Sequence, residues 1–253
     1  MKLIDFANEI SALLNMSDYD GADSSLNGVQ VGDLNSEIKK VAFAVDARLE
    51  TITQAAKIKA DLLFVHHGLF WGRPKAIVGT HYGRVKALLD NNVALFACHL
   101  PLDGHMKLGN NAQMAQKLEL EDIGMFSFYK GVHVGVKGRF KKAMTADEII
   151  KKLGVRTNAT DYIVGGGAKK FGTAAIVSGA GASDIYDAMD EGLDVLITGE
   201  SDYTTVNDCR EAGMSMLCLG HYETETFGVK AVMEYVKDNM GLETAFIDVP
   251  LGL

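Results

Sequence analysis

The chain has 253 residues, of which 47% are apolar, and its formal net charge at pH 7 is −8. This length allows two domains with buried cores, and the negative charge argues against the basic surface typical of nucleic-acid-binding proteins. Three cysteines without a CxxC pair argue against a disulfide framework. The first residues lack a signal-peptide core, and no apolar run approaches the roughly 18–20 residues of a membrane span. We therefore expect a soluble cytoplasmic protein without a membrane partner.

Helices and strands are expected to alternate in the first half of the chain. Apolar residues at helical spacing predict an amphipathic helix over residues 3–14. The polar segment 17–33 is expected to be a loop, in which Asn27 and Gln30 could face a pocket or simply form a turn. The elements that follow are strand 41–45, a helix over 47–59 with Asp46 as N-cap, strand 61–67, helix 82–91, strand 93–98 and helix 110–118.

The second half repeats part of the first. With a shift of 133 positions, strand 41–45 falls on residues 174–178, and strand 61–67 falls on residues 194–200. With a shift of 122 positions, strand 93–98 falls on residues 215–220. We therefore expect an α/β fold of two pseudo-repeated lobes that contain βαβ units, with limits at residues 1–126 and 127–253.

The remaining elements lie in an insert between the repeats and at the C-terminus. The insert is expected to contain strand 133–140, a capping box from Thr145 to Glu148 that starts a helix ending near Leu153, and strand 161–164. Thr224 is expected to cap a long helix through Met240, and a strand over 245–249 follows. This last helix and strand could complete the sheet of the first lobe.

Two adjacent histidines, His66 and His67, end the apolar strand 61–67. In open α/β sheets, ligands bind at the carboxyl ends of the strands. Neighbouring side chains in an extended strand point apart, so this pair suits two ions lying side by side better than one. A histidine pair whose hydrogen bonds are satisfied within the protein is the alternative.

Further imidazoles and carboxylates follow the ends of other strands, and these are His99, Asp103, Glu200, His221 and Glu225. Such ligands without cysteine suit two divalent ions among Zn, Fe, Mn, Co and Ni, in a cleft between the lobes. Crowded carboxylates without cations would be costly. Simpler explanations exist, because Asp103 could make a turn and Glu225 could favour the first turn of a helix.

The same segments resemble the Nif-three-like family, whose members are GTP cyclohydrolase type 1, subtype 2 homologues. The resembling segments are Asn27 to Gly32, His66-His67, His99 to Asp103 with Gly109-Asn110-Asn111, Thr198-Gly199-Glu200, and Gly220 to Glu225. The resemblance extends over nearly the whole chain, to the short bacterial-type form without an additional inserted domain.

The resemblance implies a two-domain α/β subunit with a dinuclear metal centre, assembled as a toroidal homohexamer. It implies that His67 and Asp103 bind one metal, that His66 and His221 bind the other, and that Glu225 bridges both. His99 and Glu200 remain candidates for proton transfer, and thus for catalytic roles.

The function expected from these residues is metal-dependent hydrolysis of a small anionic substrate. The specific reaction that the resemblance implies is ring opening of the guanine of GTP by water. The alternative is a metal-carrier or metal-responsive regulatory protein that performs no turnover.

Overall fold

The chain folds into two compact units. A computed structural model describes residues 1–156, 163–165 and 169–251. Unit 1 comprises residues 1–102 and 228–249, and unit 2 comprises residues 103–227 with the residues from 250 onward. No helix in these described ranges combines the length and the apolar composition that a membrane crossing needs.

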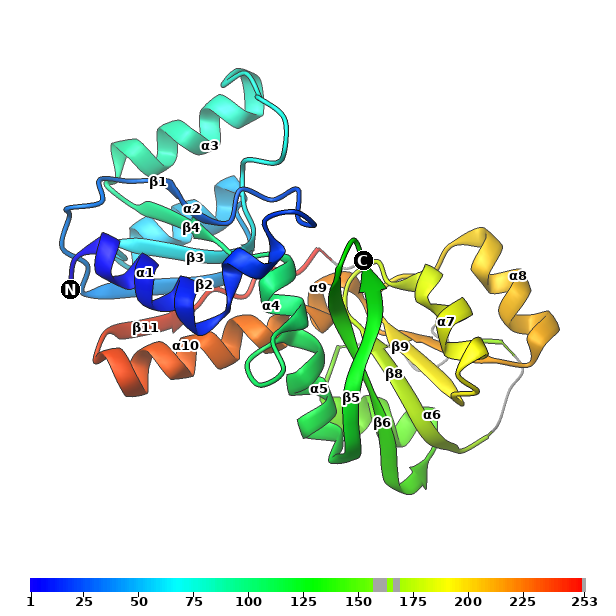
Figure 1. The fold of residues 1–253 in the computed structure, drawn as a ribbon. Helices are drawn as coiled ribbons and strands as arrows, with labels where there is room; N and C mark the ends of the chain where they lie inside the picture. Colours follow the sequence, from blue (N-terminus) through cyan, green and yellow to red (C-terminus); the bar gives the residue numbers. More distant parts are fainter. Residues whose placement is uncertain (157–162, 166–168, 252–253) are drawn as a thin grey trace. The chain divides into compact units, whose positions relative to one another are not determined.

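Unit 1 contains one sheet with a core of parallel strands. Its strands are ordered β1-β4-β3-β2-β11. The parallel strands are β2 (Lys40–Asp46), β3 (Leu62–His67), β4 (Ala94–Ala97) and β11 (Glu243–Phe246), and β1 (Gly28–Val31) pairs antiparallel with β4. The red strand β11 of Figure 1 thus joins the sheet of the N-terminal strands, because it pairs with β2.

Alternating side chains cover the two faces of this sheet. Phe43, Phe64 and Phe96 share one face, where Phe6 of helix α1 (Leu3–Leu13) contacts Phe96 edge-on. The opposite face packs against α2 (Leu49–Lys57) and α3 (Gly79–Asp90). Burial of each phenylalanine stabilises the unit by about 1.5–3 kcal/mol relative to exposure.

Two expectations for unit 1 are corrected, and one helix lies where no element was expected. Strand β1 and the 3-10 helix η1 (Met16–Tyr19) lie in the expected loop. Asp46 is the last residue of β2 rather than an N-cap, and α2 begins after Arg48 without a side-chain cap. The segment after β4 forms a short helix, α4 (Leu100–Gly104).

Unit 2 contains a second sheet, with the strand order β5-β6-β8-β9-β10-β7. The strands are β5 (Leu120–Tyr129), β6 (Val132–Met144), β7 (Ile163–Val164), β8 (Phe171–Val177), β9 (Val195–Thr198) and β10 (Ser215–Cys218). One face packs on α5 (Asn110–Leu118) and α6 (Ala146–Leu153), and the other on α7 (Ile185–Asp190) and α8 (Tyr203–Ala212), with η2 (Ala182–Asp184) before α7. The expected domain limit at residue 126 falls inside β5, whose hairpin with β6 belongs to unit 2.

Of the two helix N-caps expected in the second half of the sequence, the one at Thr145 is present and the one at Thr224 is not. The capping box at the start of α6 is confirmed, because the N–H of Glu148 donates to Oγ1 of Thr145 (3.2 Å) and the N–H of Thr145 donates to the Glu148 carboxylate (2.8 Å). Thr224 instead ends the short helix α9 (His221–Thr224), and α10 (Thr226–Met240) begins two residues later. The hydroxyl of Thr224 donates to the carbonyl of Gly220 at 3.0 Å.

The pseudo-repeat is present in the strand pairing, with one change of register. Val41 pairs with Leu62, and 133 positions later Ala174 pairs with Val195. Leu62 pairs with Ala94, but Val195 pairs with Ser215, which is a shift of 121 rather than 122. By this register, residue 99 corresponds to residue 220, so His99 and His221 are offset by one position. The fold class is therefore confirmed as two α/β lobes with repeated parallel strands.

Candidate metal centre

Three histidines gather at the carboxyl edge of the sheet in unit 1. His66 and His67 end β3, and His99 follows the neighbouring parallel strand β4. The ring centroid of His66 lies 4.6 Å from that of His67 and 5.0 Å from that of His99. One ring nitrogen from each of the three lies within 4.8 Å of the others. Parallel pairing of β3 and β4 thus brings His99 to residues that lie 32 and 33 positions before it in the sequence.

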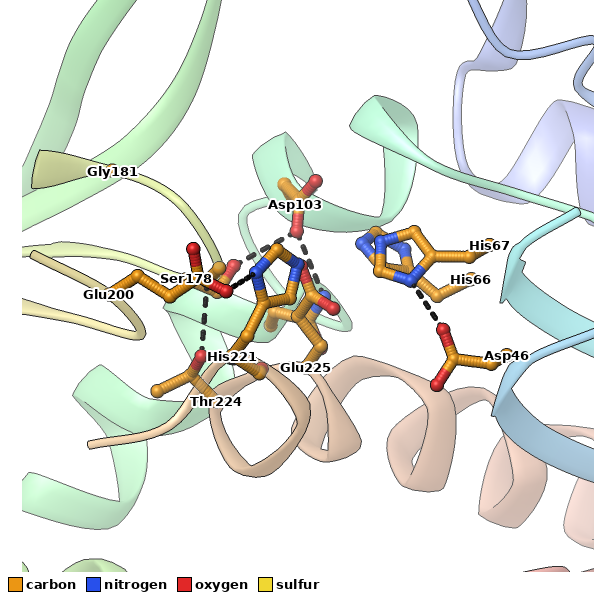
Figure 2. A network of polar contacts seen from close by, with 12 residues as sticks. Asp46, His66, His67, Asp103, Ser178, Gly181, Glu200, His221, Thr224 and Glu225 are labelled. Atoms are coloured by element: carbon orange, nitrogen blue, oxygen red, sulfur yellow. Dashed lines mark hydrogen bonds and ion pairs between the residues drawn. The ribbon is translucent and has the colours of Figure 1, made fainter. Parts of the chain in front are cut away.

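In each of these three rings, Nδ1 makes a hydrogen bond with an oxygen atom. The acceptors are the Cys98 carbonyl for His66 (3.0 Å), the Asp46 carboxylate for His67 (2.9 Å) and the Asp23 carboxylate for His99 (2.9 Å). Figure 2 shows the contact between His67 and Asp46. Carbonyl and carboxylate oxygens accept hydrogen bonds, so the proton lies on Nδ1 and a neutral ring has its lone pair on Nε2. Metal-binding histidines commonly have this second contact.

The loop after the histidine pair is fixed by the segment that contains Gln30. Oε1 of Gln30 accepts from the N–H of Leu69 at 2.7 Å, and Nε2 of Gln30 donates to the carbonyl of Leu26 at 2.8 Å. A Cβ at Gly68 would lie 2.4 Å from Nε2 of Gln30 and 2.6 Å from Cβ of Ala97, so a larger residue there would displace the Gln30 amide and clash with β4. Trp71 then donates its indole N–H to the carbonyl of Gly68 at 3.1 Å.

In unit 2, His221 lies between two carboxylates, as Figure 2 shows. Its Nδ1 is 2.7 Å from Oε1 of Glu200, and its Nε2 is 3.0 Å from Oε1 of Glu225. Burial opposes the charged ring, but the hydrogen bonds and charges of Glu225 and Glu200 outweigh it and raise the pKa of His221 to about 9. The metal-free ring is therefore an imidazolium at neutral pH.

Asp103 is buried and fixed by its neighbours in unit 2. Its Oδ1 accepts from Nδ2 of Asn110 at 2.9 Å and from the hydroxyl of Ser178 at 3.0 Å. The N–H of Ser178 in turn donates to Oδ1 of Asn111 at 2.7 Å. Ser178 follows β8, so this strand end and the Asn110-Asn111 pair together orient one carboxylate.

Gly179 leaves room for Glu225, which is only 3% exposed. The φ of Gly179 is +65°, and a Cβ there would lie 2.4 Å from Oε1 of Glu225. A side chain at this position would therefore displace the carboxylate as well as strain the backbone.

The substitution Gly179→Ala should lower both stability and metal affinity. We expect a loss of about 1–3 kcal/mol in the free energy of unfolding, measured by urea denaturation, because of strain and the clash. Gly213→Ala is the matched control, since Gly213 has φ +67° but nothing within 4 Å of the added Cβ. Equal effects of the two substitutions on metal affinity would contradict the role assigned to the space beside Glu225.

The structure thus gathers His66, His67 and His99 within unit 1, and Glu200, His221 and Glu225 within unit 2. Sequence reasoning missed Asp23, Asp46 and Ser178, which hold these side chains. Asp46 ends an apolar strand and could have been found by the same rule that found His67. Neighbouring residues give no comparable signal for Asp23.

Imidazole nitrogens and carboxylate oxygens without thiolates form a donor set that fits divalent transition metals. The orientation of His66, His67 and His99 through Nδ1 agrees with that use. These features define a two-unit α/β protein that carries, at the carboxyl ends of its strands, groups of side chains that could bind a metal ion.

The chain belongs to the Duf34/NIF3 (NGG1p interacting factor 3) family, whose model matches residues 1–250. It is 39% identical over 253 residues to a "GTP cyclohydrolase 1 type 2 homolog" of Archaeoglobus fulgidus, and the match covers all of both chains. A protein of the same name from Halobacterium salinarum is 40% identical over 256 residues, again with both chains fully covered. A solved structure from Thermus thermophilus has a TM-score of 0.86 and 34% identity, with full coverage of both chains.

Proposed function

We propose that this protein binds two divalent metal ions and uses them to hydrolyse a small anionic substrate. In this proposal, His67 and Asp103 bind one ion, His66 and His221 bind the other, and Glu225 bridges both. The observation that carries it is the common orientation of His66, His67 and His99, each with Nδ1 held by an oxygen. Histidines kept only for packing would not require the same nitrogen to be held in every ring.

Charge supports the same proposal. Asp103 and Glu225 are 8% and 3% exposed, respectively. Buried carboxylates without cations are costly, and in the metal-free protein His221 offsets part of the charge of Glu225. Two divalent ions would bring +4 against −2 from these two carboxylates, so the loaded site would attract an anion.

The chemistry that such ions supply when bound is a water pKa lowered to about 7. The chain itself would contribute proton transfer and orientation. His99 is held with its proton on Nδ1, so its Nε2 can accept a proton. Glu200 is only partly buried and contacts His221, so it can orient that ring and exchange protons with solvent.

A nucleotide is the substrate class that we propose first. The curated relatives bear the name "GTP cyclohydrolase 1 type 2 homolog", and ring opening of GTP is hydrolysis of an anionic substrate. We also propose that the protein assembles as a toroidal homohexamer. Exposed apolar side chains on the β5 hairpin, Met125 at 57% and Phe128 at 65%, support contacts between copies.

The test combines metal analysis with a nucleotide screen. Protein purified without added metal should contain about two divalent ions per chain, and a chelator should remove them together with turnover of GTP or a related nucleotide. Multiple turnover with metal retained would support a hydrolase. Transfer of metal to an acceptor protein without turnover would support a carrier instead and would overturn the hydrolytic proposal.

A further inference from the structure

A buried carboxylate distant in the sequence holds His99. The side chain of Asp23 is 1% exposed. Its Oδ1 accepts from Nδ1 of His99 (2.9 Å) and the N–H of Ser25 (2.8 Å). Its Oδ2 accepts from Nδ2 of Asn27 (2.8 Å) and the N–H of Leu100 (2.9 Å). Both oxygens of Asp23 are therefore used, and all four partners donate.

This set of donors keeps Asp23 ionised. Burial alone would raise its pKa, but His99, Asn27 and the N–H of Ser25 together lower the pKa to about 2. A carboxylate at this position can only accept from the ring of His99. The imidazole therefore carries a proton on Nδ1.

The contact with the ring is separate from the contacts that hold the backbone. The N–H of His99 donates to Oδ1 of Asn27 at 2.9 Å, and the next N–H, of Leu100, donates to Asp23. These two bonds already fix the course of the chain after β4. The bond from Asp23 to the imidazole adds a constraint on the rotation and the tautomer of the ring.

We propose that Asp23 is a positioning residue that keeps a ring proton of His99 on Nδ1, so that the lone pair of the neutral ring lies on Nε2 and is available to the histidine group of unit 1. The centroid of the His99 ring lies 5.0 Å from that of His66 and 5.7 Å from that of His67. The role of that lone pair as a proton acceptor during turnover rests on the proposed function. The tautomer itself does not rest on it.

The experiment is nitrogen-15 NMR of the histidine rings in metal-free protein at pH 8. The His99 signals are assigned by their loss in His99→Phe. In the wild type we expect the proton of His99 on Nδ1. In Asp23→Asn, one acceptor oxygen is replaced by an NH₂ group, so we expect more than half of the molecules to shift to the Nε2–H form that histidine favours in water.

Asp33→Asn is the matched control, because Oδ1 of Asp33 accepts only a local N–H, from Asn35, in an exposed turn. It should leave the His99 signals unchanged. A wild-type His99 with its proton on Nε2 would overturn the proposal, and this result does not depend on whether Asp23→Asn folds. An unchanged tautomer in folded Asp23→Asn would also overturn it.

A second readout separates this inference from the proposed function. The four donors that hold Asp23 belong to His99, Ser25, Asn27 and Leu100, and the five proposed metal ligands are not among them. Asp23→Asn should therefore retain two metal ions per chain while turnover falls about 10–100-fold, the usual cost of losing such a supporting contact. A changed tautomer without any measurable wild-type turnover would leave the positioning role standing and would contradict only the hydrolytic function.

Discussion

Substitution of Glu225 by glutamine should abolish tight binding of the metal pair and, with it, hydrolytic turnover. The amide keeps the shape of the side chain and can still accept from Nε2 of His221, so the fold should persist. A neutral amide cannot replace a carboxylate shared by two cations. We expect metal affinity to fall by more than the roughly 10–100-fold typical of a supporting contact, measured by elemental analysis after dialysis.

Glu223→Gln is the matched control. Glu223 lies two positions earlier in α9, and its carboxylate binds Arg156 at 2.8 Å instead of the ring of His221. This variant should keep its metal. Stoichiometric metal in Glu225→Gln after the same dialysis would remove Glu225 from the bridging position.

Metal affinity of the metal-free protein should rise steeply with pH. The pKa of His221 is raised to about 9, so the ring must lose a proton before it can bind a metal. Well below that pKa, each unit of pH should change affinity about tenfold, and because half of the rings are deprotonated at pH 9, the change between pH 7 and pH 9 is about 50-fold. Competition with a chelator of known pH dependence measures this slope.

The stability of the metal-free protein should show the opposite trend. A raised pKa means that the folded state binds the proton more tightly than the unfolded state. This contribution is fully present below the ordinary histidine value of about 6.5 and is lost as the pH rises through about 9. His221→Gln should remove the His221 component of both trends. Slopes that persist unchanged in this variant would show that another group titrates.

Local patterns predicted the elements and much of the candidate site. An apolar run ending in His66-His67 is sufficient to indicate a buried strand, because strands covered on both faces need continuous apolar residues. It also indicates a pair of imidazoles at the ligand-binding edge of the sheet. The capping box at Thr145 was equally local, since both of its hydrogen bonds join residues three positions apart.

The supporting contacts could not be predicted in this way, because they join distant parts of the chain. Asp23 is 76 positions from His99, and Ser178 is 75 positions from Asp103. Asp46 was assigned to the following helix because aspartate is a good N-cap, but its carboxylate binds His67 across the parallel pair β2 and β3. Tertiary contact decided between two plausible roles.

The limits of the units have a related cause. Strand β5 was not expected, and its pairing with β6 places it in unit 2, which begins at Asp103 and so also includes α5. The repeat predicted the pairing of the parallel strands but not the offset of one residue before His221. Ladder register depends on hydrogen bonds between strands, and an alignment of apolar runs does not determine it.

Anomalous X-ray diffraction from crystals of the metal-loaded protein tests the central claim most directly. We predict two anomalous peaks per chain, one bound by His67 and Asp103 and the other by His66 and His221, with Glu225 in contact with both. Metal bound by the side chains of one unit alone, or a single peak that Glu225 does not touch, would contradict the account.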